Sequence, residues 1–593
     1  MKIVRSQQVS GTLPKRRHEV IRWDGWGYKD CKFEFRDGVI SFRGDRYPIA
    51  GKRLNNFRHW IEELFDLNLE KDIRPRVAEP STFPEPIRNH LFLEDLRKAG
   101  VNFSEDGMDR VIRGHCQTLV DLQVLREHRY ERIPDVVVWP SCHQQVVEIV
   151  DVAVKSGVVL IPVGGNTSVS LAVSTPAIYD RTIAVIDMTQ MNRMLWVSEE
   201  NLTACFEVGI VGQDIERELH KHGYVLGHEP DSHEFSTLGG WIATRASGMK
   251  KNRYGNIEDI VERVKLVTSK GVLEKKFTAP RVSIGPDFDH VILGSEGTLG
   301  IITEAVVKIR RIPEVRHYES LVFADLETGI RFLREVAERR LQPASIRLLD
   351  NEQFKCGILL DPPAMFGNLY EVFKRFYLSK ICRFHLDKIV AVTLLFEGVK
   401  SEVVHHEKQV YTIAKKYGAV KGGEKNGRKG YMLTFVVAYI RDFAWDLSIY
   451  GESFETSVSW DKCLALCTNV KACIVRSCQA RGIKHFVVSC RVTQSYDSGA
   501  CVYVYFLFKH LGAPEQAVQL YEEIEDEARD EVLACGGTLS HHHGIGKTRS
   551  KWYPASVSQV GVQLFRAIKK ELDPGNTFAV GNLIPDEMMK AKL

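Results

Sequence analysis

The residues with the clearest potential for chemistry are three consecutive histidines, His541, His542 and His543. Histidine is the side chain that gains or loses a proton most easily near neutral pH, which suits acid/base catalysis. Glycines stand on both sides of the triplet. They allow the backbone to turn tightly and to approach a ligand closely. The segment 538–547 therefore predicts a catalytic loop.

An exposed tract and a metal site are the two alternatives for this triplet. Side chains of adjacent residues point in different directions, so three neighbours do not readily converge on one ion. No nearby cysteine or acidic pair has one of the common ligand spacings. We therefore predict that the chain holds no metal.

Length and charge narrow the class of protein. The chain has 593 residues, enough for two or more domains, and its apolar and charged fractions are those of a folded globular protein. With 80 basic and 76 acidic residues the net charge is only +4, and the basic runs are short. Nucleic acid is therefore not an expected partner.

The cysteines and the first residues bear on the compartment. The sequence does not start with an apolar stretch and a small-residue cleavage site, and its 13 cysteines are spread widely. We expect reduced thiols and no secretion. The densest group lacks a repeated C-x-x-C pattern and predicts buried structural cysteines; its members are Cys463, Cys467, Cys473, Cys478 and Cys490. No apolar run approaches the length needed to cross a bilayer.

The elements that position the histidines begin well upstream. Residues 1–130 are polar and aromatic with apparent helices, and they predict a helical N-terminal extension. An α/β pattern then starts with a strand-like run at 135–140. It is followed by 143–156, whose apolar residues recur at helical spacing. A second apolar strand, 158–161, leads directly into a glycine-containing loop.

This loop, Pro-Val-Gly-Gly-Asn-Thr-Ser at 162–168, has the composition of a phosphate cradle. Its glycines expose backbone N–H groups, and Thr167 and Ser168 add hydroxyl donors. It is neither a Walker loop nor a Rossmann fingerprint, because both of those spacings are absent. Two further segments, 229–248 and 294–303, are also rich in glycine and hydroxyl residues. Three such loops between short strands indicate a site for a large dinucleotide.

The three loops together resemble the FAD-binding domain of the vanillyl-alcohol oxidase type. The resemblance implies an α+β fold in which a cap domain with an antiparallel sheet covers the flavin. It also implies non-covalent FAD, because Asn166 stands where several relatives carry the His or Cys that bonds to the flavin. The cofactor-binding residues implied are Pro162, Val163, Gly164, Gly165, Asn166, Thr167, Ser168, Asp231, Ser232, Ser236, Thr237, Thr244, Arg245, Ala246, Ser247, Glu296, Gly297, Thr298, Leu299, Gly300 and Ile301.

The same resemblance suggests a division of the chain. We expect an extension at 1–130, an FAD-binding domain at 131–315 and a cap domain with the histidine loop at 316–560. The remaining segment, 561–593, is expected to return to the FAD-binding domain through the run Leu-Asp-Pro-Gly-Asn-Thr-Phe at 572–578.

Further segments carry a narrower resemblance that covers nearly the whole chain. These are 15–20, 23–28, 343–348, 439–442, 451–456 and 540–547. They resemble the family of alkyldihydroxyacetonephosphate synthases, also called alkylglycerone-phosphate synthases. The resemblance implies exchange of the acyl group of 1-acyl-dihydroxyacetone phosphate for a long-chain fatty alcohol, which forms the ether bond of ether lipids. FAD takes part in this reaction without net redox change.

The family resemblance also implies roles for single residues. Arg441 is expected to bind the substrate phosphate and Arg347 to lie in the shell around flavin or substrate, since arginine holds phosphate bidentately. Tyr503 is the expected acid/base, and Tyr505, on the same face of the strand 500–506, remains the alternative. His542 is its expected partner, whereas His541 and His543 are expected to shape the pocket.

The cellular location and the partners are predicted from the C-terminal residues and from the same family resemblance. The last three residues, Ala591, Lys592 and Leu593, are a one-residue variant of the Ser-Lys-Leu peroxisomal address. The resemblance implies a homodimer in the peroxisome, in peripheral contact with the membrane. It also suggests a complex with the dihydroxyacetone-phosphate acyltransferase that supplies the substrate.

Two other functions fit part of the sequence. An FAD-linked 2-hydroxy-acid dehydrogenase would share the FAD loops and a His-Gly-Ile-Gly turn, and a hydroxy acid would bleach its flavin. A catalytically inactive flavoprotein that scaffolds lipid enzymes would keep FAD without turnover. The complete set of Tyr, His and Arg candidates favours the ether-forming enzyme.

Overall fold

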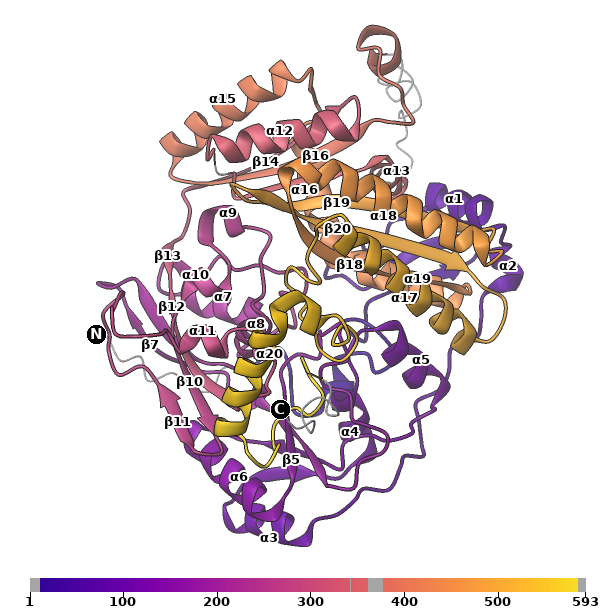
Figure 1. Ribbon diagram of the computed structural model, residues 1–593. Helices are drawn as coiled ribbons and strands as arrows, with labels where there is room; N and C mark the ends of the chain where they lie inside the picture. Colours follow the sequence, from indigo (N-terminus) through magenta and orange to yellow (C-terminus); the bar gives the residue numbers. More distant parts are fainter. Residues whose placement is uncertain (1–10, 342, 361–376, 585–593) are drawn as a thin grey trace.

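A computed structural model describes residues 11–341, 343–360 and 377–584. In Figure 1 the predicted cap domain lies at the top, and the domain predicted to bind FAD, called the FAD-binding domain from here on, lies below it. The last long helix runs down the front. No helix in the described ranges is long and apolar enough to span a membrane.

The FAD-binding domain contains two sheets. The first has the order β3-β4-β6-β5, in which β4 (Val136–Trp139), β6 (Ile183–Asp187) and β5 (Val159–Val163) are parallel and β3 (Asn102–Ser104) is antiparallel. The crossover from β4 to β5 is α6 (His143–Ser156), which ends at Gly157 with a positive φ of 68°. The predicted strand–helix–strand unit is confirmed, and it delivers the loop after β5 to the edge of the sheet.

The second sheet of this domain is antiparallel, with the order β11-β10-β12-β8-β7. Its strands are β7 (Met194–Ser198), β8 (Thr203–Glu207), β10 (Val261–Thr268), β11 (Gly271–Glu274) and β12 (Ile301–Lys308). One large apolar cluster joins it to the first sheet through Leu160, Phe206, Trp241 and Leu299. This shared core fixes the three glycine-rich loops relative to one another.

The cap domain is built on a seven-stranded antiparallel sheet with the order β17-β14-β16-β15-β19-β20-β18. The strands are β14 (Val315–Phe323), β15 (Ser345–Leu349), β16 (Val390–Gly398), β17 (Val420–Lys421), β18 (Ile449–Ser459), β19 (Phe486–Ser495) and β20 (Gly499–Lys509). Helices cover its outer face, as Figure 1 shows. They are α12 (Leu326–Glu338), α15 (Lys400–Lys416), α18 (Trp460–Ala480) and α19 (Pro514–Ala534). These helices do not cover the opposite face of β18, β19 and β20, and this face carries side chains of the candidate site.

Alternation along β20 shows how the sequence divides these two faces. Val502, Val504 and Phe506 lie in the apolar cluster under the helices, whereas Tyr503 and Tyr505 point to the opposite side. The two tyrosine rings stack with centroids 5.8 Å apart, so the predicted common face is confirmed. Of the five clustered cysteines, Cys463, Cys467, Cys478 and Cys490 are buried in the core between α18 and the sheet, as the sequence predicted. Cys473, also on α18, is only partly buried, so the prediction was wrong for this residue.

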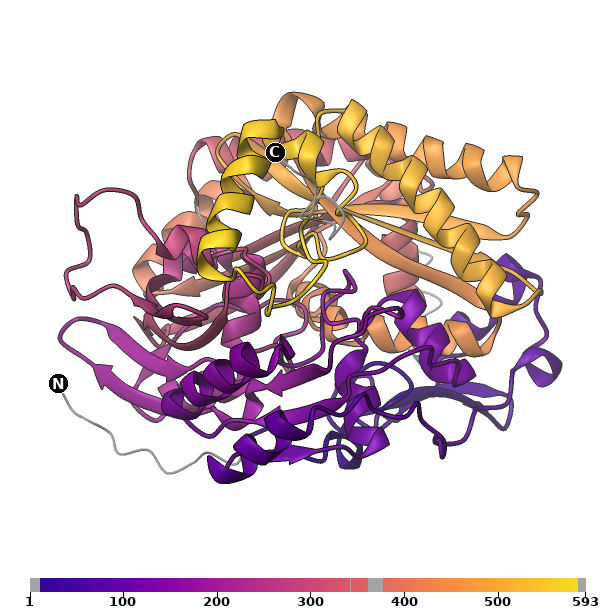
Figure 2. The same ribbon diagram turned by 60° about the horizontal axis from the view of Figure 1, so that its bottom comes forward.

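The N-terminal region contains helices and also a hairpin that the sequence analysis did not predict. Helices α1 (Asn55–Phe65), α3 (His90–Lys98), α4 (Gly107–Gly114) and α5 (Leu119–Glu127) accompany the pair β1 (Lys32–Arg36) and β2 (Val39–Arg43). Aromatic residues of the hairpin and α1 pack on α17 (Val437–Asp446) of the cap domain. Figure 2 shows this region running along the underside of both domains. The N-terminal region therefore joins the two domains.

The C-terminal segment returns to the FAD-binding domain. After α20 (Tyr553–Leu572), Phe578 pairs with Leu160 of β5 in a parallel bridge, and the Leu160 N–H donates to the Thr577 carbonyl at 2.7 Å. The predicted return of this segment is confirmed. The first glycine loop follows β5 directly. The C-terminal segment therefore stabilises the strand from which this loop begins.

Candidate active site

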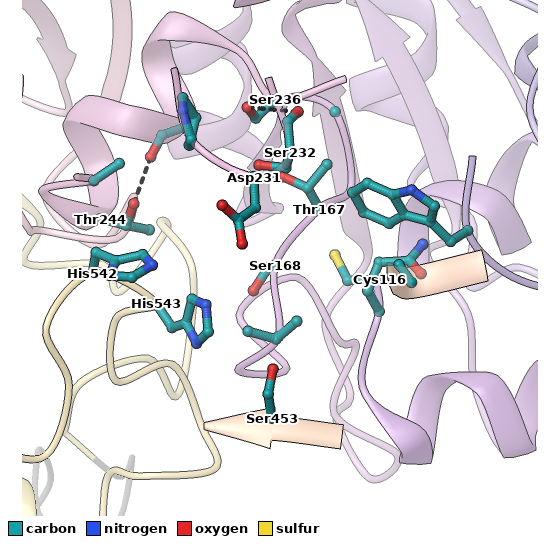
Figure 3. A pocket seen from close by; sticks show the side chains of 18 of the residues that line it. Cys116, Thr167, Ser168, Asp231, Ser232, Ser236, Thr244, Ser453, His542 and His543 are labelled. Carbon is teal, nitrogen blue, oxygen red and sulfur yellow. Dashed lines mark hydrogen bonds between the residues drawn. The ribbon is translucent and has the colours of Figure 1, made fainter. Parts of the chain in front are cut away.

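A cavity of about 480 Å³ lies between the glycine-rich loops and the free face of the cap sheet. Figure 3 looks into it: Thr167, Ser168, Asp231 and Ser232 come from the FAD-binding domain, and His542 and His543 face them from the C-terminal loop. Ser453 reaches it from β18 of the cap sheet. The two domains thus contribute opposite walls of one site.

The wall from the FAD-binding domain is shaped by close backbone approach. A Cβ added to Gly165 would lie 1.9 Å from the carbonyl oxygen of Phe235, and one added to Gly164 would lie 2.1 Å from the Thr237 hydroxyl. Only glycine permits this approach, which leaves backbone and hydroxyl groups of both loops along the cavity. The donors along the cavity fit a dinucleotide such as FAD.

An arginine from the N-terminal region holds the first loop in place. Buried Arg17 donates to the Gly164 carbonyl at 2.5 Å and to the Asp187 carboxylate at 2.8 Å, and it also donates to the Asn166 side chain. Burial lowers the pKa of Arg17 to about 10, despite the attraction of Asp187. It therefore stays charged at neutral pH. The segment 15–20 was noted for its resemblance, but nothing local in it indicates this contact across 149 residues.

Most of the predicted cofactor-binding residues line the cavity, including the whole loop 162–168, Asp231, Glu296 and Gly297. Arg245, Ser247, Thr298, Leu299 and Ile301 do not line it. Instead, the Ser247 hydroxyl donates to Asn256 at 2.7 Å and the Thr298 hydroxyl to the Ser295 carbonyl at 2.6 Å. These residues support the shape of the loops.

Tyr503 and the histidine triplet meet at the cap wall. The Tyr503 hydroxyl lies 2.6 Å from Nε2 of His542 and 3.2 Å from Nε2 of His543. No histidine contact is found for Tyr505 among the described residues. Burial raises the pKa of Tyr503 well above its ordinary value and lowers the pKa of His542. The resting pair is therefore a neutral phenol and a neutral imidazole, which can exchange one proton.

Glu455 holds the histidine loop in this position. Its carboxylate accepts from the backbone N–H groups of His541 and His543, the latter at 2.9 Å, and from the Ser540 hydroxyl at 2.7 Å. The register of β18 and β20 places Glu455 opposite Tyr503. No role was predicted for Glu455 from the sequence, although it lies in the segment 451–456, which carries part of the family resemblance.

The same loop raises the question of a metal. Glu455, Cys501, His541 and His542 are a group whose potential ligand atoms lie within 4.8 Å of one another. The Nδ1 atoms of the two histidines are 2.7 Å apart, which is a hydrogen-bond distance. Two imidazoles on one tetrahedral zinc would hold their nitrogens about 3.3 Å apart, given Zn–N bonds near 2.0–2.1 Å. The observed arrangement is that of a hydrogen-bonded chain.

The two predicted arginines differ in their exposure to the cavity. Arg441 lines it and donates to the Gln117 carbonyl at 2.6 Å and to Asp442 at 2.9 Å. Arg347 does not line it. Its guanidinium donates to the Thr434 hydroxyl at 2.8 Å and lies 5.2 Å from the ring centre of Tyr431.

A third arginine, Arg491, was missed by the sequence analysis. It lines the cavity, its guanidinium lies 4.9 Å from the ring centre of Tyr503, and it donates to Asp231 at 3.0 Å. This ion pair joins the cap wall to the second FAD loop. No motif surrounds Arg491, so its place depends on the pairing of β19 with β20.

Comparisons with known proteins agree with this geometry. A family model described as "FAD binding domain" matches residues 134–275, and one described as "FAD linked oxidases, C-terminal domain" matches residues 312–583. The fold resembles a solved p-cresol methylhydroxylase structure, with a TM-score of 0.62 at 14% identity and coverage of 86% of this chain and 99% of that one. An Arabidopsis thaliana mitochondrial D-lactate dehydrogenase is 25% identical over 77% of this chain and 75% of its own length.

More similar proteins match nearly the whole chain. An alkyldihydroxyacetonephosphate synthase of Caenorhabditis elegans is 45% identical, with 98% of each chain covered, and one of Dictyostelium discoideum is 32% identical over 96% of this chain and 94% of its own. A solved structure of an alkyldihydroxyacetonephosphate synthase superposes with a TM-score of 0.82 at 30% identity, covering 95% of this chain and 98% of that one.

The fold and the site define an FAD-binding enzyme built from a vanillyl-alcohol oxidase type domain and an antiparallel cap, as the sequence predicted. The chain belongs to the alkyldihydroxyacetonephosphate synthase family.

Proposed function

We propose that this protein exchanges the acyl group of 1-acyl-dihydroxyacetone phosphate for a long-chain alcohol and so forms an ether bond. The observation that carries the proposal is the hydrogen-bonded pair of Tyr503 and His542 at the wall of a cavity that the FAD loops also line. The names of the full-length relatives point to the same reaction. When bound, FAD supplies an electron sink for a reaction at the carbon next to the substrate ketone.

The phosphate of the substrate needs a cationic anchor, and Arg441 is the proposed one. Its side chain is largely buried, and its guanidinium lies 3.4 Å from the carboxyl group of Glu452, which also lines the cavity. Burial raises the pKa of Glu452 to about 8, although Arg441 opposes this shift. At neutral pH the Glu452 carboxyl is mostly protonated, so the net charge beside it favours an anion.

The long chains of the two substrates need an apolar space. One part of the cavity provides it, because side chains from α1, from residues 433–440 and from β20 meet there. The apolar lining residues are Trp60, Leu360, Leu433, Val437, Ala438, Ile440 and Leu507. Burial of each methylene contributes about 0.8 kcal/mol, so a long chain gains much of its affinity from this wall.

Anaerobic turnover of the purified flavoprotein with palmitoyl-dihydroxyacetone phosphate and hexadecanol tests the proposal. We expect equal amounts of alkyl product and free fatty acid without an added electron acceptor. The 2-hydroxy-acid dehydrogenase is the alternative, and it is disfavoured because the dehydrogenase relative is only 25% identical. Flavin bleaching by a hydroxy acid, with no ether product, would favour that alternative.

We also propose the location and the partners that the family resemblance implies. These are a peroxisomal homodimer with non-covalent FAD, in peripheral contact with the membrane and in a complex with the acyltransferase that supplies its substrate. The tripeptide Ala591-Lys592-Leu593 supports the location and lies outside the described residues. Deletion of Leu593 tests it: the protein should leave the peroxisome, and an unchanged location would contradict the proposal. Precipitation of the polypeptide with trichloroacetic acid should release the flavin into the supernatant.

A further inference from the structure

Four side chains form an unbroken line of hydrogen bonds that begins at the cavity and leads away from it. The Tyr503 hydroxyl lies 2.6 Å from Nε2 of His542, and Nδ1 of His542 lies 2.7 Å from Nδ1 of His541. Nε2 of His541 then lies 2.5 Å from the hydroxyl of Tyr496. Each group in this line can both donate and accept a proton.

The line ends near the surface. Tyr496 follows β19 at the turn to β20, and the next two residues, Asp497 and Ser498, are exposed. At this end the Asn256 amide donates to the Tyr496 hydroxyl at 3.3 Å, and the Lys251 ammonium lies 3.5 Å from the ring centre. The inner end at Tyr503 is 5% exposed and Tyr496 is partly exposed, so the four groups lead from a buried phenol towards the surface.

The protonation states suit transfer along this line. Burial lowers the pKa of His541 to about 3 and also lowers the pKa of His542. Both imidazoles are therefore neutral at physiological pH, and each has one N–H donor and one free nitrogen acceptor. If all three hydrogen bonds reverse their direction together, a proton that arrives at Tyr503 leaves from Tyr496 with no charge left in the core.

The second imidazole that contacts Tyr503 offers no such exit. Nδ1 of His543 has no hydrogen-bond partner among the described residues and lies 3.5 Å from Glu455, which is itself 1% exposed. A proton passed to His543 would remain inside the protein. The branch through His542 and His541 is therefore the one that reaches the turn.

The proposed reaction requires such an exit. The bond between C1 and the acyl oxygen breaks, and the carboxylate leaves with the electron pair. The bond between C1 and the alcohol oxygen forms, and the alcohol loses its hydroxyl proton. Because a fatty acid is ionised at neutral pH, each turnover leaves one proton over. It must pass from the dry site to solvent water.

We propose that Tyr503, His542, His541 and Tyr496 form a proton relay that carries this proton from the site to the turn between β19 and β20. The proposal rests on the ether-forming function above. It gives Tyr496 a role that no motif indicates, and it makes His541 a relay group where the sequence analysis expected it to shape the pocket.

The test follows ether product and released proton in the same first turnover. The FAD-loaded protein is mixed with palmitoyl-dihydroxyacetone phosphate and hexadecanol in weak buffer with a pH-indicator dye. Tyr496→Phe removes the last relay group, and His541→Gln keeps hydrogen-bonding atoms but cannot shift a proton between them. Tyr417→Phe is the matched control, because its hydroxyl donates to Glu335 at 2.8 Å on the far side of the cap.

For the wild-type protein and the control, we expect proton release to keep pace with ether formation. In both relay variants the first ether product should form at a near-normal rate, whereas proton release and kcat fall at least about tenfold. Equal slowing of product and proton in the first turnover would mean a structural role and would overturn the relay. Normal proton release by Tyr496→Phe would also overturn it. A wild-type protein that forms no ether would overturn the proposed function and the relay together.

Discussion

The two walls of the cavity are built in different ways. The FAD-side wall consists of backbone, and glycines bring it close: Gly165 packs against the Phe235 carbonyl with no space for a Cβ. The cap-side wall consists of side chains from three strands and a distant loop, held by hydrogen bonds such as those from the histidine loop to Glu455. A backbone wall can be recognised from local sequence, but a side-chain wall depends on tertiary pairing. The wall that carries Tyr503 and the histidines is thus the one that depends on tertiary pairing.

Among substitutions in the cap-side wall, Tyr503→Phe should have the largest effect. It removes the proposed acid/base hydroxyl and keeps the ring, so we expect FAD to stay bound and kcat to fall by about 10²–10⁴. Tyr505→Phe is the comparison, since Tyr505 stacks on Tyr503 but contacts no histidine in the described structure. Steady-state assays and the flavin absorbance of both variants provide the measurement. A larger loss for Tyr505→Phe would reverse the assignment.

Gly165→Ala tests the FAD-side wall. The new Cβ would meet the Phe235 carbonyl, a backbone atom that cannot rotate away. Overpacking of this kind costs about 1–3 kcal/mol, so FAD affinity should fall roughly tenfold to hundredfold. Gly357→Ala is the matched control, because nothing lies within 4 Å of its added Cβ. Flavin titration of the two apoproteins gives the result, and equal affinities would mean that the close approach does not shape the FAD site.

The same contrast explains what the sequence could predict. The strand β5, its glycine loop and the common face of Tyr503 and Tyr505 follow from local periodicity and composition, and all were predicted. The link from Tyr503 to His542 spans 39 residues and was predicted from the family resemblance.

Three residues that shape the site escaped prediction. Arg17 reaches Asp187 across 170 residues, Arg491 reaches Asp231 across 260, and Glu455 reaches the Ser540 hydroxyl across 85. Each contact depends on how separate domains or strands are packed, and no spacing in the sequence encodes that packing. Contacts between side chains that lie far apart in the sequence could therefore be identified only from the structure.

Arg441→Lys tests how strongly phosphate binding depends on a planar guanidinium. Lysine keeps the charge but loses the fork that bonds to Gln117 and to a phosphate together. Loss of one charge-assisted hydrogen bond costs about 1.5 kcal/mol, so KM should rise about tenfold with kcat less affected. Arg491→Lys is the comparison in the same assay. A larger rise in KM for that variant would move the phosphate anchor to Arg491.

Glu452→Gln should have the smallest effect, visible only as a change in pH dependence. Because burial raises the pKa of Glu452 to about 8, its carboxyl is mostly neutral at pH 7 and ionises as the pH rises through 8. Ionisation places a negative charge beside Arg441 and should weaken phosphate binding. We expect the wild-type KM to rise a few-fold between pH 7 and pH 9, and the glutamine variant to show a flatter profile. Identical profiles would mean that Glu452 does not face the bound phosphate. That outcome would limit the electrostatic contribution of the cap-side wall to its arginines.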